Sequence, residues 1–384
     1  MKHLNQSMLL LKPGMLHKYL ELASNPEILS LSIGEPDFQT PYHIRQAAIE
    51  TIEQGKTFYT PAKGLLGLRK EIASFYDRKY GLSYDPNTQI MATIGASEAI
   101  ELSLRTLLNE GDEVIIIGPA YLSYEPLILM TGAHVVTVDT YEQDAFKLCG
   151  KALEAKITDK TRLIVLNYPN NPTGAIMTHE DYADIARVLK DKDIMVISDE
   201  IYSELNYTKT HASLAHQPGM KDKVIILNGF SKTYAMTGWR LGYILATQEL
   251  IELFVKYHQN AILCPPTISQ FAGLEALKNG DEDIEMMRDE YDMRRRLALD
   301  KLNSLGLTCP NPEGAFYLFM NVKKRTGLGS EAFCEALLKE KKVALIPGNA
   351  FGPSGEGYVR FSYCYSLAHI KEALVRIESF IQSI

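Results

Sequence analysis

The sequence predicts an α/β fold: a doubly wound, mostly parallel sheet of seven strands, joined to a smaller α+β domain. Two observations lead to this prediction. Between about residues 46 and 280, short β-branched runs alternate with helical patterns. Several of these runs are apolar nearly throughout, as expected for strands that carry helices on both faces. We therefore expect a large domain over residues 46–280 and a small domain formed by residues 281–384 together with residues 1–45.

The seven expected strands are the apolar runs of the large domain. They cover residues 88–94, 113–118, 134–139, 162–167, 193–199, 223–230 and 242–246. Between them lie helical patterns such as "SEAIELSLRTLLNEG", in which Ile100, Leu104 and Leu108 fall on one face. Beyond residue 280 a charged helix, three short apolar runs and a final amphipathic helix from Ala368 indicate the α+β domain.

Composition and charge point to a small-molecule partner. The chain has 384 residues with 46% hydrophobic and 23% charged residues, which is typical of a globular protein. Its formal charge of -7 argues against nucleic acid or an anionic membrane as the main partner. No segment has the apolar length of a membrane span, and the N-terminus lacks a signal pattern.

The cysteines indicate neither a disulfide framework nor a metal site. The chain has five, an odd number, and none is in a Cys-x-x-Cys pair. We therefore expect a cytoplasmic protein without a metal ion.

Polar residues follow the expected strands, and in a doubly wound sheet ligands bind beyond the carboxyl ends of the strands. After residues 88–94 come Gly95, Ala96 and Ser97, where a close backbone approach and the free N–H groups of a helix opened by Ser97 favour an anion. Tyr121 follows the next strand. A glycine turn with a serine cap would explain the first of these features equally well.

The later strands end in an amide, a carboxylate and a lysine. The loop "YPNNPTG" fixes Asn171, and "SDEIY" places Asp199 at a strand end with Tyr202 close behind. Ser231 and Lys232 follow the strand at residues 223–230. Asp199 alone could cap a helix, and a lysine is usually a solvated surface charge. Together, however, these side chains converge on one crevice, which is improbable for a collection of caps.

This set matches the needs of pyridoxal 5′-phosphate, whose aldehyde forms a Schiff base with a lysine, here Lys232. The pyridine nitrogen stays protonated beside a buried carboxylate, a role that suits Asp199. Asn171 and Tyr202 would hold the 3′-oxygen and lower the pKa of the imine. Tyr121 would stack on the ring.

The phosphate of this cofactor needs hydrogen-bond donors and a fixed cation. The turn at Gly95, Ala96 and Ser97 and the hydroxyl of Ser231 supply donors. Arg240 suits the cation, since a guanidinium binds phosphate in a bidentate manner.

At this point the sequence resembles the fold-type I aminotransferases of class I and II over nearly its whole length. The family's segments occur in order as "SIGEPDFQTP", "FYTPAKGLLGLR", "YPNNPTG", "SDEIY", "SKTYAMTGWR" and "GYVRFSY". Each is moderately specific, and the ordered set is highly specific.

The resemblance implies a role for each matching residue. Lys232 is the catalytic residue that forms the imine and moves the proton, and the cofactor contacts are those given above. Gly34, Asn171 and Arg360 contact the substrate, with Arg360 on its α-carboxylate. Tyr59 reaches the phosphate of the neighbouring subunit, which implies a homodimer with shared active sites. Without the resemblance, Tyr59 would be read as an ordinary core tyrosine before a turn.

Two positions depart from the family pattern. Many relatives have serine where this chain has Gly229, so one phosphate hydrogen bond is absent or comes from Ser231. The expected stacking residue is Tyr121, where others use tryptophan or phenylalanine.

The activity implied is a ping-pong transfer of an amino group between an L-amino acid and a 2-oxo acid such as 2-oxoglutarate. One alternative is β-elimination by a carbon–sulfur lyase, since the fold does not fix the reaction. A second is a regulator that binds the cofactor without turnover, but the chain leaves no room for a DNA-binding module before residue 31.

The amino donor stays open among aromatic amino acids, aspartate and N-acetyl-diaminopimelate, whose aminotransferases this chain resembles. No second arginine clearly matches a clamp for a side-chain carboxylate, so strict specificity for aspartate is doubtful. The N-terminal "KPGMLHKYLELA" is expected to pack on the body as an amphipathic helix, with Met15 and Leu16 as candidates for lining the substrate pocket.

Overall fold

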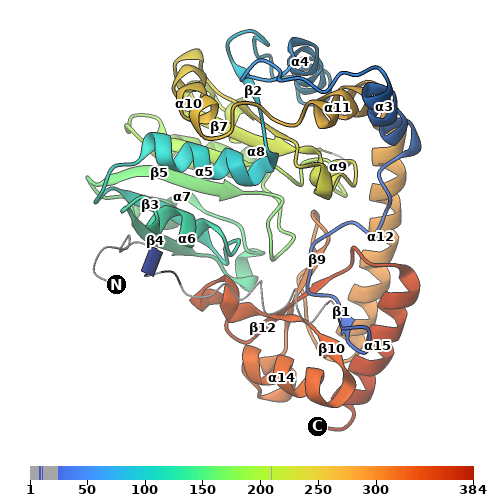
Figure 1. Cartoon of the computed structure of the whole chain (residues 1–384). Helices are drawn as coiled ribbons and strands as arrows, with labels where there is room; N and C mark the ends of the chain where they lie inside the picture. Colours follow the sequence, from blue (N-terminus) through green and yellow to red (C-terminus); the bar gives the residue numbers. More distant parts are fainter. Residues whose placement is uncertain (1–7, 10, 12–24, 209) are drawn as a thin grey trace.

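A central sheet of seven strands organises the computed structural model, which describes residues 8, 9, 11, 25–208 and 210–384 (Figure 1). The strand order is β2-β8-β7-β6-β5-β3-β4. The strands are β2 (Ile90–Thr93), β3 (Glu113–Gly118), β4 (His134–Asp139), β5 (Thr161–Asn167), β6 (Met195–Asp199), β7 (Val224–Gly229) and β8 (Gly242–Leu245). Only β8 is antiparallel to its neighbours, β2 and β7. The predicted mostly parallel sheet is confirmed, with strand ends shifted by one or two residues.

Both faces of the sheet are covered, because alternate side chains of each strand enter two different hydrophobic cores. In β3, Val114 and Ile116 pack in one core, and Ile115 and Ile117 pack in the other. The first core contains α5 (Gly95–Leu107), α6 (Tyr124–Leu129) and α10 (Gln248–Ala261). The second contains α3 (Tyr42–Glu53), α4 (Leu66–Tyr80), α7 (Gly150–Glu154), α8 (His179–Leu189) and α11 (Thr267–Asn279).

A second body is built around a third hydrophobic core, seen below the sheet in Figure 1. Its antiparallel sheet has the order β11-β12-β9, and β1 pairs in parallel with β10. The strands are β1 (Leu29–Ser30), β9 (Tyr317–Asn321), β10 (Val343–Ala344), β11 (Ile346–Pro347) and β12 (Tyr358–Ser362). The helices are α13 (Lys323–Thr326), α14 (Ser330–Lys341) and α15 (Leu367–Ile381).

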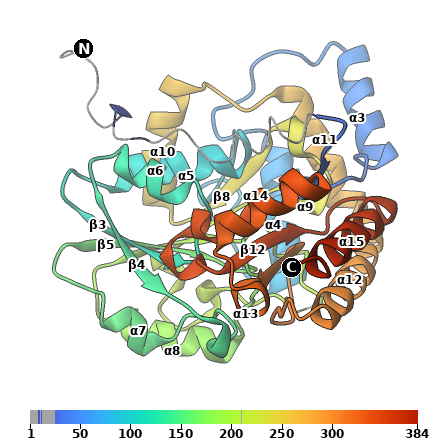
Figure 2. The ribbon, with the colours of Figure 1, turned by 90° about the horizontal axis from the view of Figure 1, so that it is seen from below.

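Strand β1 of the N-terminal region pairs with β10 of this second body. One long helix, α12 (Asp281–Ser304), reaches both bodies (Figures 1 and 2). Its Ile284 packs in the core of the large sheet, whereas Met287 and Leu299 pack in the core of the second body. The division into domains at residues 46 and 280 stays a prediction. Met15 and Leu16 lie outside the described residues.

No helix in the part of the chain that the structure describes is long and apolar enough to cross a membrane.

Candidate active site

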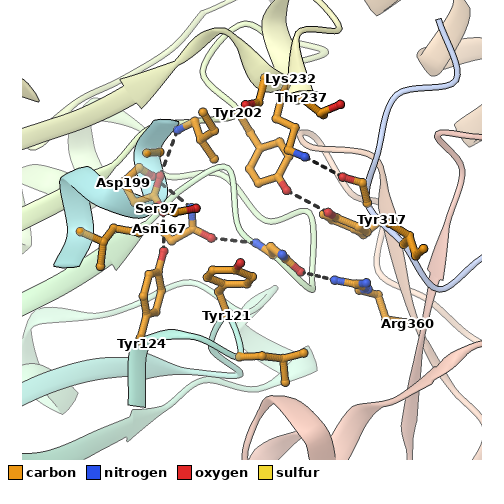
Figure 3. Close-up of a pocket in the computed structure, with 18 of the residues that line it drawn as sticks. Ser97, Tyr121, Tyr124, Asn167, Asp199, Tyr202, Lys232, Thr237, Tyr317 and Arg360 are labelled. Atoms are coloured by element: carbon orange, nitrogen blue, oxygen red, sulfur yellow. Dashed lines mark hydrogen bonds between the residues drawn. The ribbon is translucent and has the colours of Figure 1, made fainter. Parts of the chain in front are cut away.

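A cavity of about 220 Å³ lies beyond the carboxyl ends of the large sheet, between that sheet and residues of β9 and β12 (Figure 3). It brings together most of the residues singled out in the sequence. Those in its lining are Gly34, Ala96, Ser97, Tyr121, Asn171, Asp199, Tyr202, Ser231, Lys232, Arg240 and Arg360. Residues more than 300 positions apart in the chain therefore share one small space.

One end of the cavity is a turn suited to an anion. Helix α5 begins at Gly95 and not at Ser97 as expected. Gly95 itself adopts a φ of 69°, a conformation that favours glycine. A Cβ at Gly95 would lie 2.9 Å from a terminal nitrogen of Arg240. The N–H of Ile94 donates to the carboxylate of Glu98, which supports the turn. The positive end of a helix and a guanidinium thus face the same space.

The carboxylate of Asp199 lies buried at the end of β6. Its Oδ2 accepts a hydrogen bond of 2.6 Å from the hydroxyl of Tyr124, and its Oδ1 accepts one of 3.2 Å from the N–H of Ile201. No helix follows directly, so Asp199 is not a helix cap. Burial raises the pKa of Asp199 to about 6, against these two hydrogen bonds, which lower it. A cation in the cavity would stabilise its charged form.

The amine of Lys232 faces the cavity from the short helix α9 (Phe230–Thr233). Its Nζ donates a hydrogen bond of 2.6 Å to the carbonyl oxygen of Gly34. Burial lowers the pKa of Lys232 to about 8, and nearby Cys364 and Glu35 oppose that effect. Lys232 is therefore not an ordinary surface charge. Its lowered pKa leaves a substantial fraction of the amine neutral, and the neutral amine can act as a nucleophile and as a base.

Arg360 is 3% exposed, and its guanidinium lies on the opposite side of the cavity from Asp199 (Figure 3). Its Nη1 donates to Oδ1 of Asn171 at 2.8 Å, and its Nη2 donates to the carbonyl of Ser32. Its Nε is buried without a hydrogen-bond partner among the described residues, and Asn171 and Ser32, which accept from its terminal nitrogens, are uncharged. A buried cation in this state is costly unless an anion joins it.

Aromatic and hydroxyl groups complete the walls. The ring of Tyr121 packs edge-on against Tyr124 with centroids 5.4 Å apart. The hydroxyl of Tyr202 lies 2.8 Å from the hydroxyl of Tyr317. A Cβ at Gly229 would lie 3.0 Å from the carbonyl oxygen of Leu241, so a larger residue fits there only if the backbone shifts.

Tyr59 is the one predicted site residue that the single chain does not bring near the cavity. Its side chain is 83% exposed, beside Phe58, which is 80% exposed. Such exposure of two neighbouring aromatic residues is unusual for a surface without a partner.

Sequence reasoning missed four polar residues that line the cavity: Asn167, Tyr124, Thr237 and Tyr317. Three had a usable signal, since Asn167 ends a predicted strand, Tyr124 comes three residues after Tyr121, and Thr237 lies in the segment "SKTYAMTGWR". Tyr317 had none, because in "GAFYLFMNV" it looks like any aromatic residue of a buried strand.

A lysine amine, a buried carboxylate and an anion-binding turn at the carboxyl edge of such a sheet define an enzyme that handles amino groups through a phosphorylated cofactor. The chain belongs to the family of class I and II aminotransferases, whose family model matches residues 26–377. It is therefore an enzyme, a transaminase, of a family that uses pyridoxal phosphate.

Named relatives agree with this assignment. The chain is 44% identical to a putative aminotransferase of Bacillus subtilis, over 97% of this chain and 96% of the relative. It is 42% identical to aromatic-amino-acid aminotransferase 2 of Thermococcus litoralis, over 97% of each. The solved aromatic aminotransferase of Pyrococcus horikoshii superposes with a TM-score of 0.90 at 44% identity, covering 96% of this chain and 99% of that one.

Proposed function

We propose that this transaminase binds pyridoxal 5′-phosphate in the cavity and moves an amino group between an L-amino acid and a 2-oxo acid, with 2-oxoglutarate as acceptor. The observation that carries the proposal is the meeting in one cavity of the Lys232 amine, the Asp199 carboxylate and the turn at Gly95. Each supplies what one part of the cofactor requires.

The residues present fit the cofactor. Asp199 is a buried carboxylate whose two hydrogen-bond donors, the hydroxyl of Tyr124 and the N–H of Ile201, are uncharged, which suits a protonated pyridine nitrogen. The turn at Gly95, the hydroxyls of Ser97 and Ser231 and the guanidinium of Arg240 form a cradle for a phosphate. The rings of Tyr121 and Tyr202 provide apolar surface and a hydroxyl donor beside it.

When bound, pyridoxal phosphate supplies the electron sink that stabilises negative charge at the α-carbon of the substrate. The side chains of the cavity do the rest. Lys232, in its neutral form, would take the proton from the α-carbon of the substrate and deliver it to the C4′ atom of the cofactor within the same half-reaction, and the second half-reaction would reverse this transfer. Arg360 binds the α-carboxylate of the substrate, and Gly34 and Asn171 line the same place. Asn171 and Tyr202 donate to the 3′-oxygen.

The active unit we propose is a cytoplasmic homodimer in which Tyr59 of each chain contacts the phosphate bound to the other. The exposure of Tyr59 and Phe58 supports a surface that a second copy covers. The scattered, odd number of cysteines suits a reducing compartment.

For the amino donor we propose an apolar or aromatic side chain in preference to aspartate. Among the described residues of the lining, the cations are Lys232, Arg240 and Arg360, and each has a role above. The rest of the wall near Arg360 includes Ile33 and Tyr317. Amino donors can be compared with 2-oxoglutarate as acceptor by following the formation of glutamate. We expect a higher kcat/KM for phenylalanine or tyrosine than for aspartate. A preference for aspartate would contradict this choice of donor.

The experiment that tests the activity replaces Lys232 with alanine. We expect transamination to fall by at least about 10³-fold, since both a nucleophile and a general base are lost. The visible absorbance of the bound cofactor should also change. Lys301→Ala, which removes a half-buried lysine that is paired with Glu378, is the matched control and should retain activity. Normal turnover by Lys232→Ala would remove the assignment.

A further inference from the structure

Tyr317 occupies a central position between the two sides of the cavity. It begins β9 and pairs with Ser362 of β12, and its side chain is 1% exposed. The hydroxyl end of its ring projects toward the cavity (Figure 3). A Cβ at Gly34 would lie 1.9 Å from the hydroxyl oxygen of Tyr317, so residue 34 must be glycine for the ring to lie there.

The hydroxyl of Tyr317 forms a hydrogen bond of 2.8 Å with the hydroxyl of Tyr202, and either oxygen could be the donor. Tyr202 follows β6 of the large sheet, so this bond crosses from the second body to the sheet. A hydroxyl has one proton and two lone pairs. If the hydroxyl of Tyr202 donates its hydrogen bond to the 3′-oxygen of the cofactor, the hydroxyl of Tyr317 must be the donor in the bond between the two tyrosines. The hydroxyl of Tyr317 then decides the direction in which Tyr202 donates.

The face of the same ring lies against Arg360. The guanidinium carbon of Arg360 is 4.4 Å from the ring centroid of Tyr317 and 5.0 Å from that of Phe351. Cation–π attraction is strongest where water is excluded, as it is here. The ring therefore fixes the plane of the guanidinium, while Asn171 and Ser32 hold its two terminal nitrogens.

We propose that Tyr317 is a positioning residue with two separable parts: its hydroxyl orients Tyr202 toward the cofactor, and its ring orients Arg360 toward the substrate carboxylate. This inference rests on the proposed function of the cavity. The alternative is that Tyr317 only fills the hydrophobic core to which it belongs. If Tyr317 only filled the core, its replacement would lower the stability of the protein. Loss of its hydroxyl and loss of its ring would then not have separate effects on the cofactor and on substrate binding.

The hydroxyl is tested with Tyr317→Phe, which keeps the ring. The readout is the pH midpoint of the absorbance change of the bound cofactor, measured without substrate. Loss of one hydrogen bond to Tyr202 should raise this midpoint by about 0.5 to 1 pH unit, because negative charge on the 3′-oxygen is less well stabilised. The KM for the amino donor should stay within about twofold. Tyr202→Phe should give the larger shift in the same direction.

The ring is tested with Tyr317→Leu and Tyr317→Met. The readout is the dissociation constant of 3-phenylpropionate, a carboxylate that lacks the amino group and cannot react. Loss of the aromatic face should weaken its binding about tenfold, an effect that Tyr317→Phe should not show. The matched control is Tyr363→Phe, which removes another buried hydroxyl of the same core, bonded to the carbonyl of Ala315.

The outcomes separate this inference from the proposed function. A wild-type protein without cofactor absorbance and without transamination overturns the function itself. An active wild type whose midpoint is unchanged in Tyr317→Phe overturns the role of the hydroxyl, and inhibitor binding unchanged in Tyr317→Leu or Tyr317→Met overturns the role of the ring. If both ring-deleting variants fail to fold, Tyr317→Phe still decides, since an unchanged midpoint there refutes the inference.

Discussion

The two sides of the cavity are held in place by different means. On the sheet side, Asp199 ends β6 and Lys232 follows the neighbouring parallel strand β7, so the backbone ladder of the sheet sets their positions. On the other side, Gly34, Tyr317 and Arg360 come from three distant segments. Tyr317 and Arg360 lie on the paired strands β9 and β12 of the small sheet, and bonds that cross the cavity join Arg360 to Asn171 and Gly34 to Lys232.

We therefore expect the cofactor side to depend on the substrate side only through the hydrogen bond between Tyr317 and Tyr202, whereas the substrate side depends on several contacts from the sheet. A ladder of strands buried on both faces persists when one side chain at its end is changed. The substrate side instead depends on side chains that contact the sheet side. Changes at Asp199 should therefore affect the cofactor first, and changes at Arg360 should affect the substrate alone.

Asp199→Asn should cause the largest loss and would test the sheet side. We expect kcat/KM to fall about 10²- to 10³-fold, because a charge that is preorganised against the pyridine nitrogen is removed. The visible spectrum of the bound cofactor should change with it. A variant whose KM alone changed, with a normal spectrum, would break the distinction between the two sides.

The same substitution should stabilise the cofactor-free protein. Burial raises the pKa of Asp199 to about 6 from an ordinary 3.8. The folded state therefore binds this proton more tightly than the unfolded state, and the resulting stability is present below pH 3.8 and lost as pH rises through about 6. Near pH 7, Asp199→Asn should gain about 3 kcal/mol in urea unfolding. Below pH 4 the gain should vanish, and a gain that grew toward acid would contradict this account.

Arg360→Lys should have the next largest effect and would test the substrate side. Lysine keeps the charge but loses the planar fork that binds a carboxylate with two hydrogen bonds. The KM for amino donors should rise by roughly 10²-fold, while the cofactor spectrum keeps its pH midpoint within about 0.3 unit. A midpoint moved as far as in Tyr202→Phe would show that Arg360 also acts on the cofactor side.

Tyr59→Ala should have a smaller effect, about tenfold on kcat/KM, through loss of one phosphate contact supplied by the second chain. A mixture of the Tyr59→Ala protein with the Lys232→Ala protein tests directly whether the two chains share their active sites. In a mixed dimer, one site combines an intact Lys232 with an intact Tyr59 from the other chain. Refolding the two variants together in equal amounts should restore about one quarter of wild-type activity. No gain over the sum of the separate variants would exclude shared sites.

His43→Gln should have the smallest effect and lies away from both sides of the cavity. The two ring nitrogens of His43 contact Glu275 at 2.8 Å and Asp283 at 2.9 Å, which joins α3 to α11 and α12. Burial lowers the pKa of His43, but the two carboxylates together raise this pKa by more than burial lowers it. The net shift of the pKa is therefore upward.

The stability from these ion pairs should therefore be full below pH 6.5 and lost as pH rises through the raised pKa. We expect His43→Gln to lose about 0.5 to 1 kcal/mol at pH 6 and less at pH 8.5, with unchanged kcat/KM. The exposed His134→Gln serves as the control. A loss that increased with pH would refute the ion-pair explanation.

The fold and the sheet side of the site were largely predictable from the sequence. Apolar runs of β-branched residues identify the strands, and their ends fix where Asp199 and Lys232 must lie. The start of α5 was placed two residues late, because glycine is typical of a turn and the first residue of a helix is weakly specified by the sequence.

The substrate side of the site was predictable only in part. Arg360 and Gly34 were found by resemblance, whereas Tyr317 was not found at all. Its position depends on a strand pairing with β12 and on the missing side chain of Gly34, and neither leaves a periodic pattern in the sequence. Tyr59 was found by resemblance as well, although its local sequence suggested a buried residue and the single chain leaves it exposed.

The depressed pKa of Lys232 has a consequence for covalent labelling. In the cofactor-free protein at pH 8, about half of the Lys232 amines are neutral, against well under about 1% for a lysine with an ordinary pKa. A small acylating reagent that can enter the cavity should therefore modify this lysine ahead of solvated ones. Mass spectrometry of briefly treated protein would then report directly on the chemical environment of one amine among all those in the chain.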